Sequence, residues 1–248
     1  METSSTWHIV TWNIRGNHSP APRDIASALS SLAADGQIDV IALQEVRRLQ
    51  ARSIARRLGM RHVWAFKHNG YTALLPLHAE GHAVLTPHTI VGHAHETISA
   101  GEQRRSYRRR IALWADIDRA GSTLRVIDTH LASHDEPVAR LEQAARVRSL
   151  VDSSPAPSVI AGDFNDKDEP AVVATIARST HVDAWSHAIS RSTNGLTNPS
   201  EAPHQRLDHL LVPGDWTVRV VHTPSPDARW TPLSDHLPVA VTCQMRSK

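Results

Sequence analysis

The sequence predicts an α/β fold in which mixed or antiparallel β-sheets carry helices on their outer faces. Short apolar runs typical of strands recur along the whole chain. Some of these runs are separated by a tight turn, as at Gly121, and others by a segment long enough for a helix. Tight turns join antiparallel strands, whereas helical connections join parallel ones, so a purely parallel sheet is not expected.

The composition is that of a globular protein with a hydrophobic core. The chain has 248 residues, of which 40% are hydrophobic and 21% charged, and we expect a single catalytic domain over residues 1–248. No apolar run has the length of a transmembrane helix. The N-terminus lacks a secretory pattern and Cys243 is the sole cysteine, so we expect a cytoplasmic protein without an internal disulfide. A net charge of +2 does not by itself indicate a polyanionic partner, and a monomer is expected.

The first half of the chain is expected to alternate strands with helices. Asp24 suits the first turn of a helix, and Gly59 supplies a helix stop. The expected elements are a strand ending at Ile14, a helix at about 23–34, a strand at 40–43, a helix at about 47–58, and several strands between 61 and 99 with turns at Gly70 and Gly81.

The second half begins with a predicted hairpin around Gly121 and continues with helices and late strands. In the helix beginning at Pro137, the apolar residues Val138, Leu141, Ala145 and Leu150 fall near helical spacing. The expected elements are strands at 111–117 and 124–131, a helix at about 137–151, a strand ending at Asp163, a helix at about 170–177, and strands at 207–212, 217–222 and 237–243.

Five short polar motifs stand at the ends of strand-like runs or beside them. They are Trp12-Asn13, Gln44-Glu45, Asp163-Phe164-Asn165-Asp166, Leu207-Asp208-His209 and Ser234-Asp235-His236. A side chain at a strand end is held by rigid backbone but still meets solvent. Their carboxylate and amide oxygens suit magnesium, calcium or manganese. The pattern therefore predicts metal-assisted chemistry on a charged substrate, with phosphate esters as the leading class.

Each candidate also has a purely structural interpretation. Glu45 is a metal ligand or a residue stabilised at a helix N-terminus, and Asn13 is a ligand or a turn residue. Asp163 could accept a proton from an attacking water that Asn165 holds, or the two could form an Asx-type turn. Asp166 fits a helix cap better than a catalytic role.

The late motifs predict an acid–imidazole pair. Asp235 cannot easily bond to its sequence neighbour His236, so one of the two is expected to bind the metal while the other faces the phosphate. Asp208, flanked by leucines, is available to orient His236. His130 ends the apolar run at 124–127, where an imidazole could bind a phosphoryl oxygen or protonate a leaving group.

Residues 104–110 hold five arginines. They form either a phosphate-contacting loop, with Arg104, Arg105, Tyr107 and Arg108 meeting the substrate, or a solvated loop before the next strand.

Taken together, the motifs resemble the endonuclease/exonuclease/phosphatase superfamily. The matching segments occur in the family's order, and residue 82 departs from it, because His82 stands where the family commonly has asparagine. The segments are Thr11–Ile14, Leu43–Val46, Gly81–Thr86, Thr129–Leu131, Gly162–Asn165, Arg206–His209 and Ser234–Pro238.

The resemblance implies a fold, a cofactor and a set of roles. The implied fold is a four-layer α/β sandwich of two packed sheets flanked by helices. Glu45 would bind Mg²⁺ or Mn²⁺ with Asn13 and Asp235 nearby, Asp163 and Asn165 would position or deprotonate the water, and His236 with Asp208 would act as base or phosphate holder. His130 matches the deoxyribonuclease-like, sphingomyelinase-like and phosphatase-like branches, which argues against an abasic-site endonuclease.

The substrate stays open between three alternatives at this stage. Nucleic acid phosphodiesters come first because of the arginine-rich loop. A small phosphoester such as a nucleotide, an inositol phosphate or a lipid headgroup comes second, because the chain has no long insertion to grip a duplex. The third alternative is a binding module that kept the fold and lost the chemistry.

Overall fold

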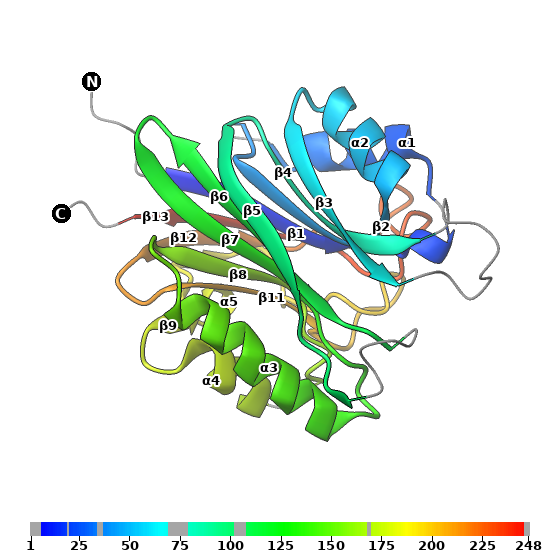
Figure 1. Cartoon of the computed structure of the whole chain (residues 1–248). Helices are drawn as coiled ribbons and strands as arrows, with labels where there is room; N and C mark the ends of the chain where they lie inside the picture. The colour runs from blue at the N-terminus through cyan, green and yellow to red at the C-terminus, as the bar shows by residue number, and fades with distance from the viewer. Residues whose placement is uncertain are drawn as a thin grey trace.

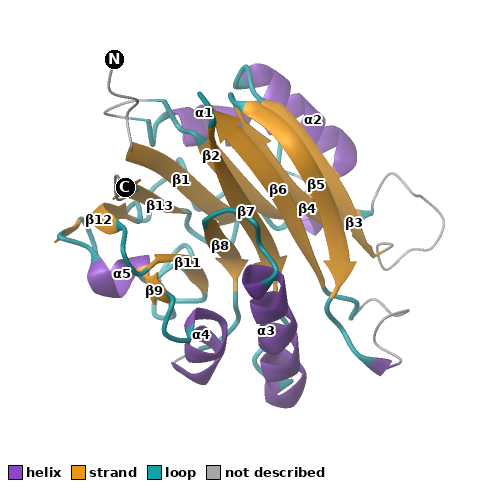
Figure 2. Cartoon of the chain, turned by 60° about the vertical axis from the view of Figure 1, so that its left-hand side comes forward, coloured by secondary structure: helices purple, strands orange, loops and turns teal. Residues whose placement is uncertain are grey.

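Two mixed β-sheets pack face to face and helices cover their outer faces, which makes the α/β sandwich that the family resemblance implied (Figure 1). This architecture is that of a computed structural model, which describes residues 6–18, 20–33, 37–68, 79–101, 108–167 and 170–245. Figure 2 shows the same layers from another side, with both sheets between the helix pairs.

The first sheet has seven strands in the order β10-β12-β13-β1-β2-β4-β3. Its centre pairs β1 parallel to β2 and antiparallel to β13, so the sheet is mixed as predicted. The bounds are β1 Thr6–Asn13, β2 Val40–Arg47, β3 Arg61–His68, β4 Glu80–Thr86, β10 Ser190–Arg191, β12 Thr217–His222 and β13 Val239–Gln244.

The second sheet has six strands in the order β5-β6-β7-β8-β11-β9. The predicted hairpin around Gly121 is present as β6 and β7, and β7 runs parallel to β8. The bounds are β5 Thr89–Thr97, β6 Ile111–Arg119, β7 Ser122–His130, β8 Ser158–Asp163, β9 His181–Asp183 and β11 Asp208–Pro213.

Apolar side chains fill three layers of core. One cluster lies between the sheets and includes Trp7, Val126 and the alternating Val239, Val241 and Cys243 predicted to face a core. A second cluster packs α1 and α2 on the first sheet, and a third packs α3 and α4 on the second. The helices are η1 Gly16–His18, α1 Pro22–Ser30, α2 Arg48–Arg57, α3 Pro137–Asp152, α4 Pro170–Ala177 and α5 Ala184–His187. No helix in the described part of the chain is long and apolar enough to cross a membrane.

The predicted turn at Gly81 is wrong. Gly81 lies inside β4 opposite Phe66 and is not a turn residue. A Cβ there would come within 2.0 Å of the Ala65 carbonyl oxygen and 2.7 Å of the Trp64 ring, so the glycine permits a close approach of β3. The other predicted turn, at Gly70, lies outside the described residues.

The buried face of α3 also differs from the predicted one. Val138 and Leu141 are exposed, at 71% and 37%, while the buried face includes Arg140, Gln143 and Val147. Arg140 donates to the Ser133 carbonyl at 2.7 Å and Gln143 accepts from the Ala132 N–H at 2.7 Å. Polar residues that tie the helix to the preceding loop therefore share the inner face with its aliphatic residues.

Candidate active site

The strand pairing brings the polar motifs to one edge of the sandwich. In the first sheet, parallel pairing sets Asn13 of β1 beside Gln44 of β2. In the second sheet, His130 of β7 lies opposite Asp163 of β8, and Asp208 of β11 lies on the other side of Asp163. Antiparallel β13 starts at this same edge, so the loop carrying Asp235 and His236 enters there as well.

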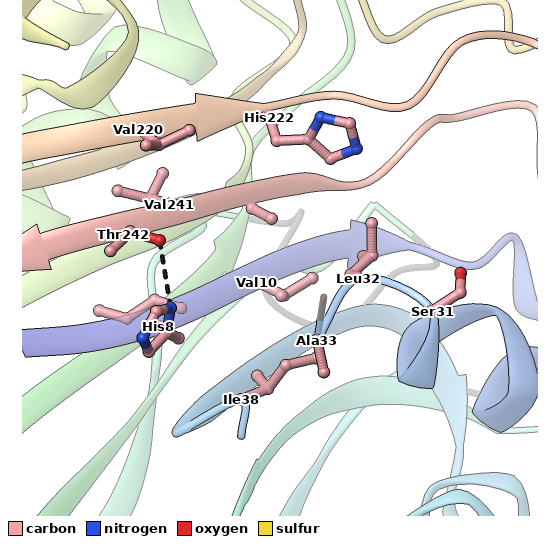
Figure 3. Close-up of a pocket in the computed structure, with 12 residues that line it drawn as sticks. His8, Val10, Ser31, Leu32, Ala33, Ile38, Val220, His222, Val241 and Thr242 are labelled. Atoms are coloured by element: carbon pink, nitrogen blue, oxygen red, sulfur yellow. Dashed lines mark hydrogen bonds between the residues drawn. The ribbon is translucent and has the colours of Figure 1, made fainter. Parts of the chain in front are cut away.

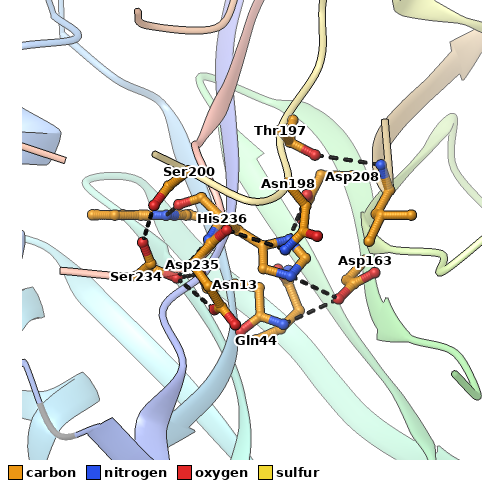
Figure 4. Close-up of polar contacts among 12 residues, drawn as sticks. Asn13, Gln44, Asp163, Thr197, Asn198, Ser200, Asp208, Ser234, Asp235 and His236 are labelled. Carbon is orange, nitrogen blue, oxygen red and sulfur yellow. Dashed lines mark hydrogen bonds and ion pairs between the residues drawn. The ribbon is translucent and has the colours of Figure 1, made fainter. Parts of the chain in front are cut away.

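Asn13 links the two sheets at this edge. Its Nδ2 lies 3.4 Å from Glu45 Oε1 in the first sheet and 3.1 Å from Asp163 Oδ2 in the second. Its Oδ1 accepts from the Arg15 N–H at 3.0 Å, and its carbonyl accepts from the Ser234 hydroxyl at 2.6 Å (Figure 4). Through its carboxamide and its main-chain carbonyl, Asn13 thus contacts the segments that carry Glu45, Asp163 and Ser234.

Glu45 adopts an unusual backbone conformation that turns it toward the site. Its φ is 55°, and the pairing of β2 with β4 shifts register between Leu43 and Val46. Gly16 makes room for this bulge, because a Cβ there would lie 1.7 Å from the Glu45 carbonyl oxygen. Strained backbone of this kind is common at functional sites.

His130 lies between the two sheets' carboxylates. Its Nδ1 is 3.6 Å from Glu45 Oε1, and its Nε2 is 3.5 Å from Asp163 Oδ2. Burial, followed by the positive charges of Arg110 and Lys67, nevertheless lowers the pKa of His130 well below its ordinary value. A neutral imidazole at this point can donate a hydrogen bond to a phosphoryl oxygen.

The expected acid–imidazole pair is present. His236 Nδ1 lies 2.7 Å from Asp208 Oδ2, and His236 Nε2 points toward Asp163 Oδ2 at 3.8 Å. Burial opposes a charged ring, but the charges of Asp208 and Asp163 and the hydrogen bond with Asp208 outweigh it, and they raise the pKa of His236 to about 10. His236 is therefore an imidazolium at neutral pH.

Asp163 and Asn165 form the Asx-type turn that was the structural alternative for this motif. Asp163 Oδ1 accepts from the Asn165 N–H at 3.0 Å, and Asn165 has a φ of 50°. Burial raises the pKa of Asp163 to about 6, with Asp208 adding to the shift and His236 opposing it. Asn165 Nδ2 donates to the Leu131 carbonyl at 3.1 Å.

Asp235 lies at the more open side of the site. Its Oδ2 is 3.4 Å from Arg15 Nε, and both side chains are about two-fifths exposed, at 38% and 42%. Arg15 N in turn bonds Asn13 Oδ1, so Asp235 and Glu45 each lie within two contacts of the same carboxamide. Residues from opposite ends of the sequence thus lie around one point.

Asp166 is a member of a buried ion-pair network instead of a helix cap. Its Oδ1 lies 2.9 Å from His209 Nε2, and Asp183 Oδ2 lies 3.7 Å from His209 Nδ1. Burial opposes the charged ring, but the interactions with Asp166 and Asp183 raise the pKa of His209 to about 9. Phe164 stacks on the same imidazole with ring centroids 5.1 Å apart, so the network supports the Asp163 turn from behind.

Three of the four predicted substrate-binding residues, Arg104, Arg105 and Tyr107, lie outside the described residues. Arg108 is described, and its Nη1 pairs with Glu136 Oε1 at 2.7 Å. Two cations near the site were missed by the sequence interpretation. Lys67 is one of three lysines in the chain, and Arg110 is the last arginine of the rich segment. Each of these two cations attracts the carboxylates of Glu45 and Asp163, and each disfavours a positive charge on His130.

The oxygen-rich donor set fits a hard divalent cation. Ligand atoms of Asp163, Asp208 and His236 lie within 4.8 Å of one another. Asp208 Oδ1 is buried without a hydrogen-bond partner among the described residues, as expected of an oxygen that meets something else. A ligand role for His236 would require the loss of its ring proton, because ligation needs a free lone pair.

This converging trio differs from the predicted ligands Asn13, Glu45 and Asp235. Asn13 and Glu45 border the trio through Asp163, whereas Asp235 faces Arg15. Carboxylate and amide oxygens from both groups suit Mg²⁺ or Mn²⁺ better than a softer metal.

A separate pocket of about 260 Å³ lies over β1, β12 and β13 beside the end of α1 (Figure 3). It is lined mainly by apolar side chains such as Val10, Leu32 and Ile38, and its described lining residues include no carboxylate. These described residues do not supply the carboxylates that a metal-assisted reaction on phosphate needs.

Comparison with known proteins identifies the group to which this site corresponds. The model of the Endonuclease/Exonuclease/phosphatase family matches residues 10–236 of the chain. That range contains every predicted site residue described above. No curated protein matches the chain in sequence.

Solved structures share the fold at low sequence identity. An endonuclease/exonuclease/phosphatase from Bacteroides vulgatus is 19% identical with a TM-score of 0.79, covering 97% of this chain and 99% of that chain. A mannosyl-6-phosphatase from Bacteroides thetaiotaomicron is 18% identical with a TM-score of 0.75, covering 96% and 100%. D. rerio TDP2 complexed with a single-strand DNA product is 18% identical with a TM-score of 0.75, covering 97% and 100%.

Proposed function

We propose, because the chain belongs to the Endonuclease/Exonuclease/phosphatase family, that it is a divalent-metal-dependent hydrolase of phosphate esters. One observation carries the proposal. Asn13 joins Glu45 of one sheet to Asp163 of the other, and His130 and His236 lie against the same Asp163. Carboxylates, a neutral imidazole and an imidazolium gathered at one edge are the groups that phosphoryl chemistry requires.

Glu45, Asn13 and Asp235 are the residues that would hold the metal, with Asp163 and Asp208 beside them. When bound, a divalent ion supplies positive charge that offsets the charge on the phosphoryl oxygens. The oxygens of these five residues come from two sheets and one loop. A loss of packing between the sheets would therefore disrupt the site as much as the loss of one ligand.

The charge states of His236, Asp163 and His130 support one of the two roles left open for His236. An imidazolium cannot accept a proton, so His236 holds the phosphate as a hydrogen-bond donor and a positive charge. Asp163, with a pKa raised to about 6, is mostly ionised at neutral pH and accepts the proton of the attacking water. His130, neutral and buried, donates to a phosphoryl oxygen.

Two substrate classes follow from this site. Nucleic acid phosphodiesters are the first, supported by the arginines of residues 104–110 and by the likeness to a TDP2 that was solved with a single-strand DNA product. Small phosphoesters are the second, supported by the likeness to a mannosyl-6-phosphatase with the same TM-score of 0.75.

A panel of phosphoesters tests the proposal. Purified protein is assayed on mono- and diesters, nucleotides and oligonucleotides with Mg²⁺, with Mn²⁺ and with a chelator. We expect turnover with the metals, none with the chelator, and at least about a 100-fold loss in Glu45→Gln and His236→Ala, because each removes several kcal/mol of charge stabilisation. The matched control is Glu142→Gln, on the exposed side of α3.

Two results would contradict the proposal. Full activity in either folded site variant would remove the assignment of residues. The absence of metal-dependent turnover across the whole panel would favour a binding module of the same fold.

A salt series separates the two substrate classes. Affinity for a polyanion falls steeply as salt rises, because bound counterions are released, whereas affinity for a small phosphoester responds weakly. A steep slope with an oligonucleotide supports the nucleic acid class, and a shallow slope with a better turnover of small esters supports the other.

A further inference from the structure

Lys67 is a buried cation without a hydrogen-bond or ion-pair partner among the described residues. It lies in β3 at the point where the pairing with β4 shifts register between Phe66 and His68, so the bulge turns its side chain inward. The residue is 3% exposed. No hydrogen bond or ion pair of its ammonium group occurs within the part of the chain that the structure describes.

Arg110, beside the other sheet, is a second cation without a side-chain partner among the described residues, and it is partly buried. It directly precedes β6, where its N–H donates to the Ser99 hydroxyl at 2.7 Å and its carbonyl accepts from the Ile98 N–H at 3.0 Å. Its backbone is thus fixed. Among the described residues, its guanidinium forms no ion pair or side-chain hydrogen bond.

Other arginines in the described ranges with similar burial are paired. Arg125 binds Asp116 through two bonds of 2.7 Å, Arg119 pairs with Asp39 at 3.1 Å, and Arg206 pairs with Asp183 at 2.5 Å. An unpaired buried cation destabilises a fold unless something compensates for it. Lys67, which is buried, and Arg110, which is partly buried, are therefore exceptions, and a bound anion would compensate their charges.

The two cations lie beside the reactive groups. The charge of Arg110 acts on Lys67, the charges of Glu45 and Asp163 act on both, and both act on His130. Strand pairing supports this placement: Lys67 follows Phe66, which lies opposite Gly81, and Gly81 lies opposite Val46, the residue after Glu45. Arg110 precedes Ile111 and Ala112, and Ala112 lies opposite Thr129, the residue before His130. An anion bound at His130 would therefore be attracted electrostatically by both cations.

We propose that Lys67 and Arg110 form an anion-binding subsite that receives a terminal, doubly charged phosphoryl group. The subsite rests on the proposed function, since it selects among phosphate esters: two fixed cations match the two charges of a phosphomonoester, whereas a diester carries one. The terminal phosphate belongs to a small phosphomonoester or to the end of a nucleic acid strand. Charge-assisted bonds from such donors are among the stronger ones in proteins.

Phosphate binding by the metal-free protein tests the subsite without any turnover. Inorganic phosphate is titrated into wild-type protein and into Lys67→Met and Arg110→Gln, and the affinity is followed by calorimetry. We expect each variant to bind at least about 10-fold more weakly, as for loss of a hydrogen bond to a charged group. The control is Arg61→Gln, an exposed cation at the opposite end of β3, which is expected to leave the affinity unchanged.

Thermal stability separates ligand binding from a structural role. Lys67→Met removes an unpaired buried charge and keeps the length of the side chain, so its Tm is expected to equal or exceed that of wild type. A lower Tm with unchanged phosphate affinity would overturn the proposal, because Lys67 would then be a structural residue.

Kinetics on paired substrates supply the specificity. The kcat/KM for the monoester p-nitrophenyl phosphate is divided by that for the diester bis-p-nitrophenyl phosphate. This ratio is expected to fall about 10-fold in Lys67→Met, because turnover of the monoester loses more. Oligonucleotides with and without a terminal phosphate distinguish the nucleic acid source from the small one. An unchanged ratio with full turnover would overturn the subsite alone, while phosphate binding without turnover of any ester would overturn the hydrolase alone.

Discussion

Three buried histidines at this edge of the sandwich have three different charge behaviours. Burial and nearby cations keep His130 neutral, whereas carboxylate partners keep His236 and His209 protonated. Residue type alone does not distinguish them, since burial opposes the charged form of all three. Each ring has two carboxylates nearby, but only His236 and His209 have one at hydrogen-bond distance, at 2.7 and 2.9 Å, and His130 also faces the cations Arg110 and Lys67.

The charge of His236 depends on Asp208. In Asp208→Asn the hydrogen bond at 2.7 Å is kept in shape but its negative charge is lost, so we expect the pKa of His236 to fall and activity at neutral pH to drop by about 100-fold. NMR titration of the imidazole and a pH–rate profile measure the two effects. The control is Asp24→Asn, a half-exposed aspartate in α1 that pairs only with its neighbour Arg23 among the described residues. An unchanged pKa of His236 would show that Asp208 does not set its charge.

His209 makes stability depend on pH. Its folded pKa of about 9 lies above the ordinary value of 6.5, so its contribution is fully present below pH 6.5 and is lost as pH rises through 9. The loss amounts to at most about 3 kcal/mol. We expect the difference in unfolding free energy between wild type and His209→Gln to shrink over this range. Urea unfolding from pH 6 to 10 measures it, and a constant difference would contradict the ion-pair network.

At the scale of single elements, α3 shows where periodicity misleads. The helix boundaries follow from Pro137 and the turn-rich segment after Asp152, and they were predicted within a residue. Its inner face was not, because Arg140 and Gln143 are buried as donors and acceptors for loop carbonyl and amide groups. Hydrophobic spacing in a sequence indicates only the apolar residues of a buried face, and it does not indicate the polar ones.

The β4 strand depends on the absence of a side chain at Gly81. We expect Gly81→Val to lower the unfolding free energy by about 3 kcal/mol, since backbone atoms of Ala65 and the Trp64 ring occupy the space of a Cβ. Urea denaturation measures the loss. Gly121→Ala is the comparison, because nothing lies within 4 Å of a Cβ there and only its φ of 85° opposes the change. An equal or smaller loss in Gly81→Val would contradict the packing argument.

At the scale of the whole molecule, a buried polar cluster connects the two sheets beneath the site. Gln44 Nε2 donates to Asp128 Oδ1 at 2.7 Å and to Thr11 Oγ1 at 3.0 Å. His82, the departure from the family pattern, lies 3.4 Å from Asp128 Oδ2 in the same interior. Burial raises the pKa of Asp128, so this carboxyl depends on its partners. Gln44 precedes Glu45, so the cluster also sets where Glu45 meets the second sheet.

Gln44→Leu tests this connection. We expect the unfolding free energy to fall by about 2 kcal/mol, because Asp128 Oδ1 loses its donor in the interior, and activity to fall because Glu45 is less well placed. Chemical denaturation and turnover measure the two losses. Gln37→Leu, at an exposed position before β2, is the control. Equal effects in the two variants would show that the cluster does not hold the sheets together.

The sequence by itself predicted most of the strands and helices in order, the family, and the strand-end residues that lie together, but it missed β9, α5 and β10. These are local features, because a polar residue after an apolar run is recognised from its sequence neighbours alone, without knowledge of its partners in space. Tertiary structure alone decided that Lys67 and Arg110 have no side-chain partner in the described part of the chain, that Asp166 pairs with His209, and which face of α3 is buried. Such contacts join residues as far apart as Asn13 and Asp163, 150 positions along the chain, and a periodicity of two or four residues carries no information over that distance.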